Sequence, residues 1–349
     1  MRLRFIPYFL ALTLTVSCAT PIFQFDDQGH SDRKYDSRYP ASDVSNTLGE
    51  MVKSVRKINS MAFYRSFTIS EESKLRRSEI RREYVKQIAI EDTIYDQTVL
   101  GTATVLHAED RWLVALTCAH IIDFPDTIIR YYPEPGNPSE RNVQMVAFKI
   151  RQQNSIPSFP NDAKVEVLAE NRRLDAALIG VRFEYNPENP VPVFPFPAGK
   201  SRQLNWGHFV YLAGYPMSTR MITRGIVSRP QTNAENRFII DAVFNPGMSG
   251  GPVVAIRDGI PNFEFVGIVR ATAAEPYHVL TPTSEKGDMQ SEYYPNLPHR
   301  DEIYTTFIQG IRYGITYVIP IENILRFIRE HQPDLQSKGY SLSKFLAKR

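Results

Sequence analysis

The sequence predicts an all-β protein built from two antiparallel β-barrels, with a short N-terminal helix and a C-terminal helix. Between residues 61 and 181, short apolar runs rich in β-branched residues alternate with Gly, Pro and Asn. Many short strands separated by such turn residues are typical of a barrel or a sandwich. Residues 184–200 then carry prolines at positions 187, 190, 192, 195 and 197, which makes a stiff, extended connector. We interpret this connector as the crossing from a first barrel to a second.

The first barrel is expected over about residues 46–183. Thr47 and Glu50 form a capping-box pattern, and Leu48, Met51 and Val55 recur at helical spacing, which predicts a short helix before the first strand. The charged residues 71–82 are expected to form a helical insert. Strands are predicted at residues 61–69, 84–90, 99–106, 112–117, 128–132, 143–150, 165–169 and 176–181.

The second barrel is expected over about residues 201–332, with Pro320 at the first position of a closing helix. Residues 333–349 are expected to form a C-terminal tail. Residues 274–309 are long, polar and proline-containing, and we expect them to form a lid or specificity loop. Strands are predicted at residues 209–213, 224–228, 238–241, 252–256, 263–270 and 316–319.

Ser249 lies among three glycines between two predicted strands. Glycine allows the backbone to approach closely and to adopt positive φ, so the N–H groups of Gly247 and Ser249 can converge on one point. Converging N–H groups stabilise a developing oxyanion. A plain glycine-rich turn is the alternative. Residues 247–251 also fit the nucleophile elbow of α/β-hydrolases, but a strand follows the serine where that fold needs a helix, and the best histidine precedes it.

Two upstream residues give this serine a chemical context. His120 ends an apolar strand pattern, and Asp175 leads into another. A serine becomes a good nucleophile when a histidine takes its proton and a carboxylate fixes the tautomer of that histidine. Asp175 is otherwise a turn residue, but a carboxylate entering an apolar strand is costly to bury unpaired.

Cys118 is the alternative nucleophile, because a spacing of two residues on a strand places it on the same side as His120. We favour a small buried apolar role for it. The other histidines lack a comparable setting, and their spacing predicts no metal site. No cofactor is expected.

The order His120, Asp175, Ser249 and the local motifs resemble the trypsin-like serine peptidases, most closely their HtrA-type branch, over about residues 48–331. The resemblance implies two six-stranded barrels, catalytic roles for His120, Asp175 and Ser249, and an oxyanion hole at Gly247 and Ser249. It also implies a serine endopeptidase, here without the PDZ domain that many HtrA-type proteases carry. The similar motifs are residues 117–120, 175–178, 214–216, 225–228, 241–251 and 314–320.

The same resemblance implies a substrate-binding region. An extended substrate is expected to pair along residues 266–270 by β-augmentation. Because none of the pocket residues is acidic, we expect small or medium apolar P1 residues. Arg270 could favour an acidic substrate residue nearby; otherwise it is an ordinary surface arginine. The expected substrate-binding residues are Val243, Ile268, Val269, Arg270 and Ala271.

The N-terminus reads as an export signal. Arg2 and Arg4 precede an apolar run, so residues 1–17 are predicted to be a signal peptide. Residues 15–18 resemble a bacterial lipobox, which implies cleavage before Cys18 and lipidation of its thiol; an ordinary leader cut nearby is the alternative. Residues 18–45 are predicted to be a flexible tether reaching roughly 30 Å from a membrane. The expected location is the bacterial cell envelope, as a periplasmic lipoprotein.

The charge is nearly balanced, since loss of Arg2 and Arg4 with the leader lowers the formal net charge of +3 by two. No basic stripe suggests nucleic acid. The expected partners are protein or peptide substrates, a membrane through the N-terminal lipid and, by resemblance, other copies of the chain. Two alternatives remain: a catalytically silent peptide-binding or chaperone module on this fold, and a structural lipoprotein.

Overall fold

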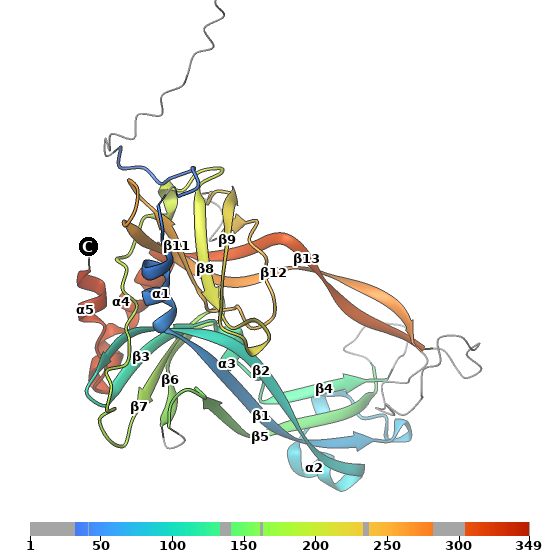
Figure 1. Cartoon of the computed structure of the whole chain (residues 1–349). Coiled ribbons are helices and arrows are strands. Elements are labelled where there is room, and N and C mark those ends of the chain that lie inside the picture. Colours follow the sequence, from blue (N-terminus) through green and yellow to red (C-terminus); the bar gives the residue numbers. More distant parts are fainter. Residues whose placement is uncertain are drawn as a thin grey trace, which may run out of the picture.

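The computed structural model describes residues 32–40, 42–132, 141–160, 163–232, 237–281 and 304–348. It confirms an all-β fold in two units that lie against each other (Figure 1). The first is a seven-stranded sheet in the order β4-β5-β1-β2-β3-β7-β6, and the second is a closed barrel in the order β10-β13-β12-β11-β8-β9. The second barrel therefore has the six strands expected, whereas the first unit has one strand more and an open strand order.

The first unit begins with a helix that stops earlier than predicted. Val55, which fits the helical spacing, lies instead in a strand and is fully buried there. The elements of this unit are α1 (Ser45–Lys53), β1 (Val55–Ile69), α2 (Arg82–Ile88), β2 (Ala89–Glu109), β3 (Trp112–Thr117), α3 (Ala119–Ile122), β4 (Thr127–Tyr131), β5 (Val143–Ser155), β6 (Lys164–Asn171) and β7 (Ala176–Arg182), with 3-10 turns at Glu71–Ser73 and Arg77–Glu79.

The strand predicted at residues 84–90 is wrong, because this segment forms helix α2. Val85 of α2 is fully buried in a small cluster with Phe67 and Ile69 of β1, so tertiary packing favours a helix here. β1 and β2 pair as far as Ile69 and Ala89 and carry this cluster outward as an arm with β4 and β5 (Figure 1). This extension of β1, β2 and β5 accounts for the difference from a simple barrel.

The second unit follows the predicted strand order closely. Its elements are β8 (Phe209–Gly214), β9 (Met221–Arg229), β10 (Phe238–Ile240), β11 (Pro252–Ile256), β12 (Phe263–Thr281), β13 (Tyr304–Pro320), α4 (Ile321–Ser337) and α5 (Ser343–Ala347), with 3-10 turns at Ser201–Gln203 and Pro216–Ser218. The proline-dense connector reaches both units. Phe194 N–H donates to the Val105 carbonyl of β2, and Gly199 N–H donates to the Phe265 carbonyl of β12.

The ends of the predicted loop at residues 274–309 are strands, which corrects that prediction. β12 and β13 continue as a paired ribbon out to Thr281 and Tyr304. The ribbon projects to the same side as the arm of the first unit (Figure 1). Residues 282–303, on which the lid hypothesis also depends, lie outside the described residues.

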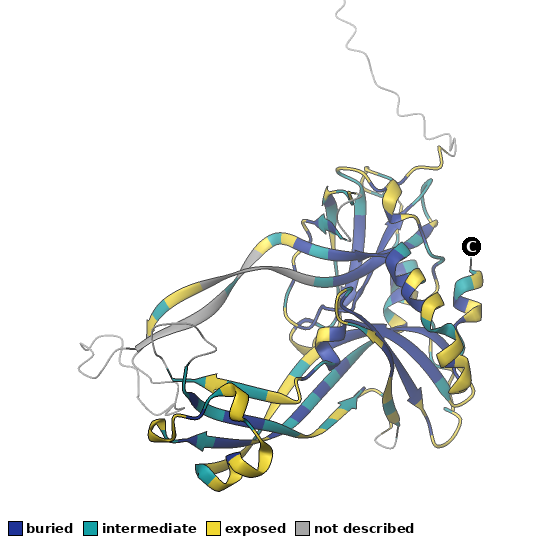
Figure 2. Cartoon of the chain, turned by 180° about the vertical axis from the view of Figure 1, so that it is seen from behind, coloured by how far each residue is buried: buried dark blue, intermediate teal, exposed yellow. Residues whose placement is uncertain are grey.

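The C-terminal segment packs against both units rather than forming a tail. α4 runs to Ser337, beyond the boundary predicted at residue 332. The Tyr340 ring lies edge-on to Trp112 of β3 with centroids 4.9 Å apart, and its hydroxyl donates to Glu166 of β6 at 2.6 Å. Phe345 is 1% exposed and contacts the ring of Phe265 in β12. The dark core in Figure 2 runs through this junction.

The described part of the predicted tether packs on the second barrel. Tyr35 is 4% exposed, its hydroxyl donates to Glu264 at 2.6 Å, and the Arg257 guanidinium lies over its ring. Residues 32–40 are thus held against β11 and β12 rather than extended from the domain. The predicted signal peptide and Cys18 lie outside the described residues. Among the residues described, no helix has the length and apolar character to cross a membrane.

Candidate active site

The predicted catalytic residues lie at the junction of the two units, where Arg270 contacts both Ser249 and Asp175. His120 lies on α3 just after β3, and Asp175 occupies the turn that leads into β7. Ser249 lies in the loop between β10 and β11 of the closed barrel. That loop is joined to the first unit through β2, because Thr102 N–H donates to the Ser249 carbonyl at 2.8 Å.

Asp175 is held by its turn and aimed at His120. Its N–H donates to the Asn171 carbonyl, and its own φ is +64°, a left-handed value that aspartate tolerates better than most residues. The carboxylate accepts the His120 backbone N–H at 2.9 Å, and its Oδ1 and Oδ2 lie 3.0 and 2.9 Å from His120 Nδ1. With an ionised carboxylate the Nδ1 atom is the donor, which leaves Nε2 as the basic nitrogen.

The charge state of Asp175 follows from these contacts. Burial by itself raises the pKa of Asp175, but hydrogen bonds from His120 and Arg270 outweigh it and lower the pKa below the usual value. The Asp175 carboxylate is therefore ionised at neutral pH although only 9% of the side chain is exposed.

Arg270 is a partner of Asp175 that the sequence did not suggest. Its Nε donates to Asp175 Oδ2 at 3.1 Å. Arg270 was predicted to be a substrate-binding residue, whereas in the structure its guanidinium contacts the predicted catalytic carboxylate. A register shift in the pairing of β12 with β13 falls between Val269 and Ala271. No local sequence pattern predicts that bulge, so the contact between Arg270 and Asp175 could not be predicted from the sequence.

Ser249 is held in a loop that requires its glycines. A Cβ at Gly247 (φ +102°) would lie 2.3 Å from the Tyr215 carbonyl, and one at Gly250 (φ +85°) would lie 2.1 Å from the Thr102 carbonyl. Ser249 itself is 6% exposed, and its hydroxyl donates to the Arg270 carbonyl at 3.0 Å rather than to His120.

The two amides predicted to form the oxyanion hole are oriented by their neighbours. Met217 N–H donates to the Pro246 carbonyl, which fixes the plane of the peptide that carries the Gly247 N–H. Gly251 N–H donates to the Met248 carbonyl at 3.0 Å, which fixes the plane of the peptide that carries the Ser249 N–H. Thr102 Oγ1 donates to the Gly247 carbonyl at 2.6 Å and accepts the Tyr215 N–H at 3.0 Å, so it holds the peptide between these two. Within the described chain, neither Gly247 N–H nor Ser249 N–H has an acceptor, so both can donate to a ligand.

The predicted substrate-binding residues divide into three groups. The side chains of Ile268 and Val269 are fully buried, so side-chain contact with a substrate is ruled out for both. Val243 is 49% exposed, and Arg270 is directed at Asp175. The Ala271 side chain lies outside those the structure describes.

The part of β12 that is free to pair with an extended substrate begins later than predicted. At Gly267 and Ile268 this strand is paired on one side with β11 and on the other with β13. Pairing with β11 ends at Pro252 and Ile268, whereas pairing with β13 continues beyond Arg270. An extended peptide could therefore join β12 from Arg270 onward, but not along the whole of residues 266–270.

Cys118 has the properties of a buried structural residue. Its thiol lies 3.2 Å from the Val269 carbonyl, and burial raises the pKa of Cys118 well above the ordinary value, so the thiol stays protonated. Ligand atoms of Cys118, His120 and Asp175 lie within 4.8 Å of one another. A protonated thiol and a guanidinium on the same carboxylate both disfavour a cation there, and the absence of a metal stays a prediction.

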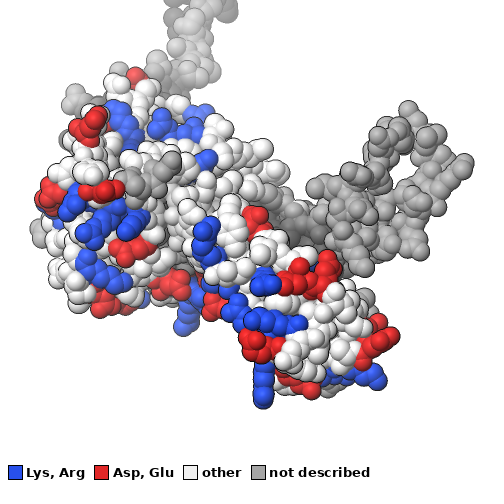
Figure 3. Space-filling view, turned by 90° about the horizontal axis from the view of Figure 1, so that it is seen from below, with Lys and Arg blue, Asp and Glu red and all other residues white. Residues whose placement is uncertain are grey.

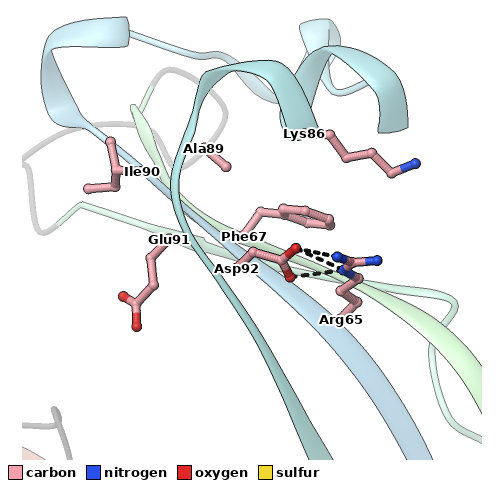
Figure 4. Close-up of a pocket in the computed structure, with 7 residues that line it drawn as sticks. All are labelled: Arg65, Phe67, Lys86, Ala89, Ile90, Glu91 and Asp92. Carbon is pink, nitrogen blue, oxygen red and sulfur yellow. Dashed lines mark hydrogen bonds and ion pairs between the residues drawn. The ribbon is translucent and has the colours of Figure 1, made fainter.

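A separate pocket lies on the arm of the first unit and contains no predicted site residue. It forms where α2 joins β2, and an ion pair between Arg65 and Asp92 lies along one side (Figure 4). On the molecular face shown in Figure 3, cationic and anionic side chains are interspersed rather than gathered into one stripe.

Comparison with known proteins finds one family similarity, in the middle of the chain. Residues 101–268, which contain His120, Asp175 and Ser249, match the family model described as a trypsin-like peptidase domain. No curated protein matches the sequence significantly. Among solved structures, the serine endoprotease from Yersinia pestis is similar at 16% identity, with a TM-score of 0.40, over 84% of this chain and 68% of that chain. The segment that matches the trypsin-like peptidase domain thus spans parts of both the seven-stranded sheet and the closed barrel.

Proposed function

We propose that the protein is a serine endopeptidase that hydrolyses peptide bonds with Ser249, His120 and Asp175. One observation carries the proposal: the imidazole of His120 is bound through Nδ1 to a buried carboxylate, and in the nearby serine loop the N–H groups of Gly247 and Ser249 have no acceptor among the described residues. A base fixed in one tautomer and a preorganised oxyanion site are the two requirements of acyl transfer to serine.

In the proposed reaction the Ser249 hydroxyl leaves the Arg270 carbonyl and donates to His120 Nε2. Its oxygen attacks the scissile carbonyl as the proton moves to Nε2, and the oxyanion accepts hydrogen bonds from Gly247 and Ser249 N–H. Collapse of this intermediate transfers the proton to the departing amine and leaves an acyl-enzyme. Water, activated by His120, then attacks the ester and releases the acid and free Ser249.

The same geometry supports a substrate class. A peptide that pairs with β12 from Arg270 onward would take the Arg270 carbonyl as an acceptor and so free the Ser249 hydroxyl for His120. The exposed Val243 side chain offers an apolar wall without charge. We therefore propose small or medium apolar P1 residues.

The proposed setting is the bacterial cell envelope. The leader at residues 1–17 supports export, and the lipobox-like residues before Cys18 support a lipid anchor. An exported endopeptidase of the HtrA type would fit a role in envelope protein quality control, with homo-oligomers as a possible form. Incorporation of labelled palmitate into the wild type, but not into Cys18→Ser, is the expected result; equal labelling of both would contradict the anchor.

Hydrolysis of a library of internally quenched peptides tests the enzymatic proposal. We expect cleavage after small or medium apolar residues, and a loss of roughly 10⁴-fold or more in kcat/KM for Ser249→Ala. The silent peptide-binding alternative is favoured by one observation, the absence of a Ser249–His120 hydrogen bond. Peptide binding of equal affinity in both proteins, with no cleavage by either, would establish that alternative.

A further inference from the structure

Arg270 touches two members of the proposed triad through different atoms. Its side-chain Nε donates to Asp175 Oδ2 at 3.1 Å, and its carbonyl oxygen accepts the Ser249 hydroxyl at 3.0 Å. His120 Nδ1 lies 2.9 Å from the same Oδ2 atom. One carboxylate oxygen is thus shared between the imidazole and a guanidinium.

The groups around Asp175 make Arg270 the main source of fixed charge. Among the described residues, three titratable side chains lie near the carboxylate: His120 on α3, Arg270 on β12, and Cys118 just before α3. The buried thiol is uncharged, and an arginine remains charged at every pH at which the protein is folded. The Arg270 side chain is 35% exposed and the Asp175 side chain 9%, so solvent screens this ion pair only in part.

The position of Arg270 on β12 keeps this contact in place. The strand is paired with β13 on both sides of Arg270, and the register shift there turns the guanidinium toward the first unit. A β-bulge commonly redirects one side chain in this way. The contact also joins the two units across the predicted site, because Asp175 belongs to the sheet and Arg270 to the barrel.

We propose that Arg270 is a positioning residue that anchors Asp175 and offsets part of its negative charge, which extends peptide hydrolysis to lower pH. This inference rests on the proposed function. A free carboxylate would stabilise the protonated imidazole more strongly, so the base would be lost at a higher pH. A guanidinium on the same oxygen weakens that stabilisation while it holds the carboxylate in the orientation that His120 requires.

The test compares Arg270→Gln, which removes the charge, with Arg270→Lys, which keeps it. In pH profiles of kcat/KM, we expect the acid limb of Arg270→Gln to move up by roughly one pH unit, and that of Arg270→Lys to stay near the wild type. Arg326→Gln, which removes an exposed arginine from α4, is the matched control for the loss of one positive charge and should keep the wild-type profile. An acid limb at the same pH in wild type and Arg270→Gln would overturn the charge role, even if kcat/KM of the variant is lower at every pH.

A second readout separates this inference from the proposed function. The same Arg270 variants in a Ser249→Ala background can be followed by NMR titration of the His120 ring, which needs no turnover. We expect the midpoint of the ring signal to move to higher pH in Arg270→Gln and not in Arg270→Lys. If this shift is seen but the protein with Ser249 intact never hydrolyses peptides, the peptidase proposal is refuted and the charge effect of Arg270 stands. No shift in an active peptidase would refute the role of Arg270 alone.

Discussion

At the scale of single residues, the proposed catalytic site depends on one buried carboxylate with several donors. Asp175 receives the His120 backbone N–H, the His120 ring and the Arg270 guanidinium. These contacts keep it ionised despite its burial, and an ionised Asp175 in turn fixes the tautomer of His120. The ionisation of Asp175 can be measured in the pH dependence of the stability of the fold.

Replacement of Asp175 by Asn should change how stability depends on pH. Because the folded-state pKa of Asp175 is lowered, its stabilisation is present above roughly pH 4, the unfolded value, and is lost as pH falls through the folded value. Asp175→Asn should therefore lose stability less steeply than the wild type below roughly pH 4 in urea unfolding. Asp96→Asn, at an exposed position of β2, is the control, and equal slopes for wild type and Asp175→Asn would contradict the expectation.

Replacement of Val243 by Asp should change the substrate residue that is preferred. The side chain is half exposed at the predicted primary pocket, so a carboxylate there should favour Lys or Arg at P1 over apolar residues. The ratio of kcat/KM for a basic over an apolar peptide should rise by roughly 10- to 100-fold. Val243→Leu serves as the uncharged control, and an unaltered ratio in Val243→Asp would remove Val243 from the pocket.

At the scale of elements, the nucleophile loop depends on β2 of the opposite unit. Thr102 donates its hydroxyl to the Gly247 carbonyl, accepts the Tyr215 N–H, and binds the Ser249 carbonyl through its own N–H. The Thr102 side chain is fully buried, so water does not replace these partners. The peptides next to the two predicted oxyanion amides are thus held by an element that lies far earlier in the chain than Ser249.

Thr102→Val is a nearly isosteric test of that dependence. Loss of the hydroxyl leaves the Tyr215 N–H without its acceptor, at a cost of about 1–3 kcal/mol in unfolding free energy. If the Gly247 peptide then loses its orientation, kcat should fall by roughly 10- to 100-fold with a smaller change in KM. Thr102→Ser, which keeps the hydroxyl, should restore most of the rate. A kcat of Thr102→Val equal to that of wild type would show that the nucleophile loop keeps its conformation without the Thr102 hydroxyl.

Particular elements show what sequence patterns can and cannot predict here. β3 and β11 begin and end at the predicted residues, because each is a short, almost entirely apolar run. α2 was predicted as a strand, because the cluster that buries Val85 comes from distant parts of the chain. Arg270 was assigned to the pocket for a similar reason, since its contact with Asp175 depends on a bulge in β12 and on the packing of two units.

At the scale of the whole molecule, the C-terminal segment holds the sheet and the barrel together. Tyr340 packs on Trp112 and binds Glu166 of the sheet, while Phe345 packs on Phe265 of the barrel. The site lies at the same junction, with His120 and Asp175 from one unit and Ser249 from the other. Geometry at the site should therefore respond to changes far from it.

Phe345→Ala should destabilise the protein and lower activity together. Truncation of this fully buried ring is expected to cost about 3–5 kcal/mol in unfolding free energy. Lys344→Ala, at an exposed position one residue earlier, breaks only a surface pair with Glu109 and should change stability little. Calorimetry of both variants provides the comparison, and equal melting temperatures for Phe345→Ala and wild type would contradict a structural role for the C-terminal segment.

Covalent labelling by a fluorophosphonate probe, mapped by mass spectrometry, tests the central claim most directly. The account predicts one modified residue, Ser249, with labelling abolished in Ser249→Ala and strongly slowed in Asp175→Asn because His120 loses its oriented partner. A folded wild-type protein that never reacts, or that reacts equally after Ser249→Ala, would contradict it.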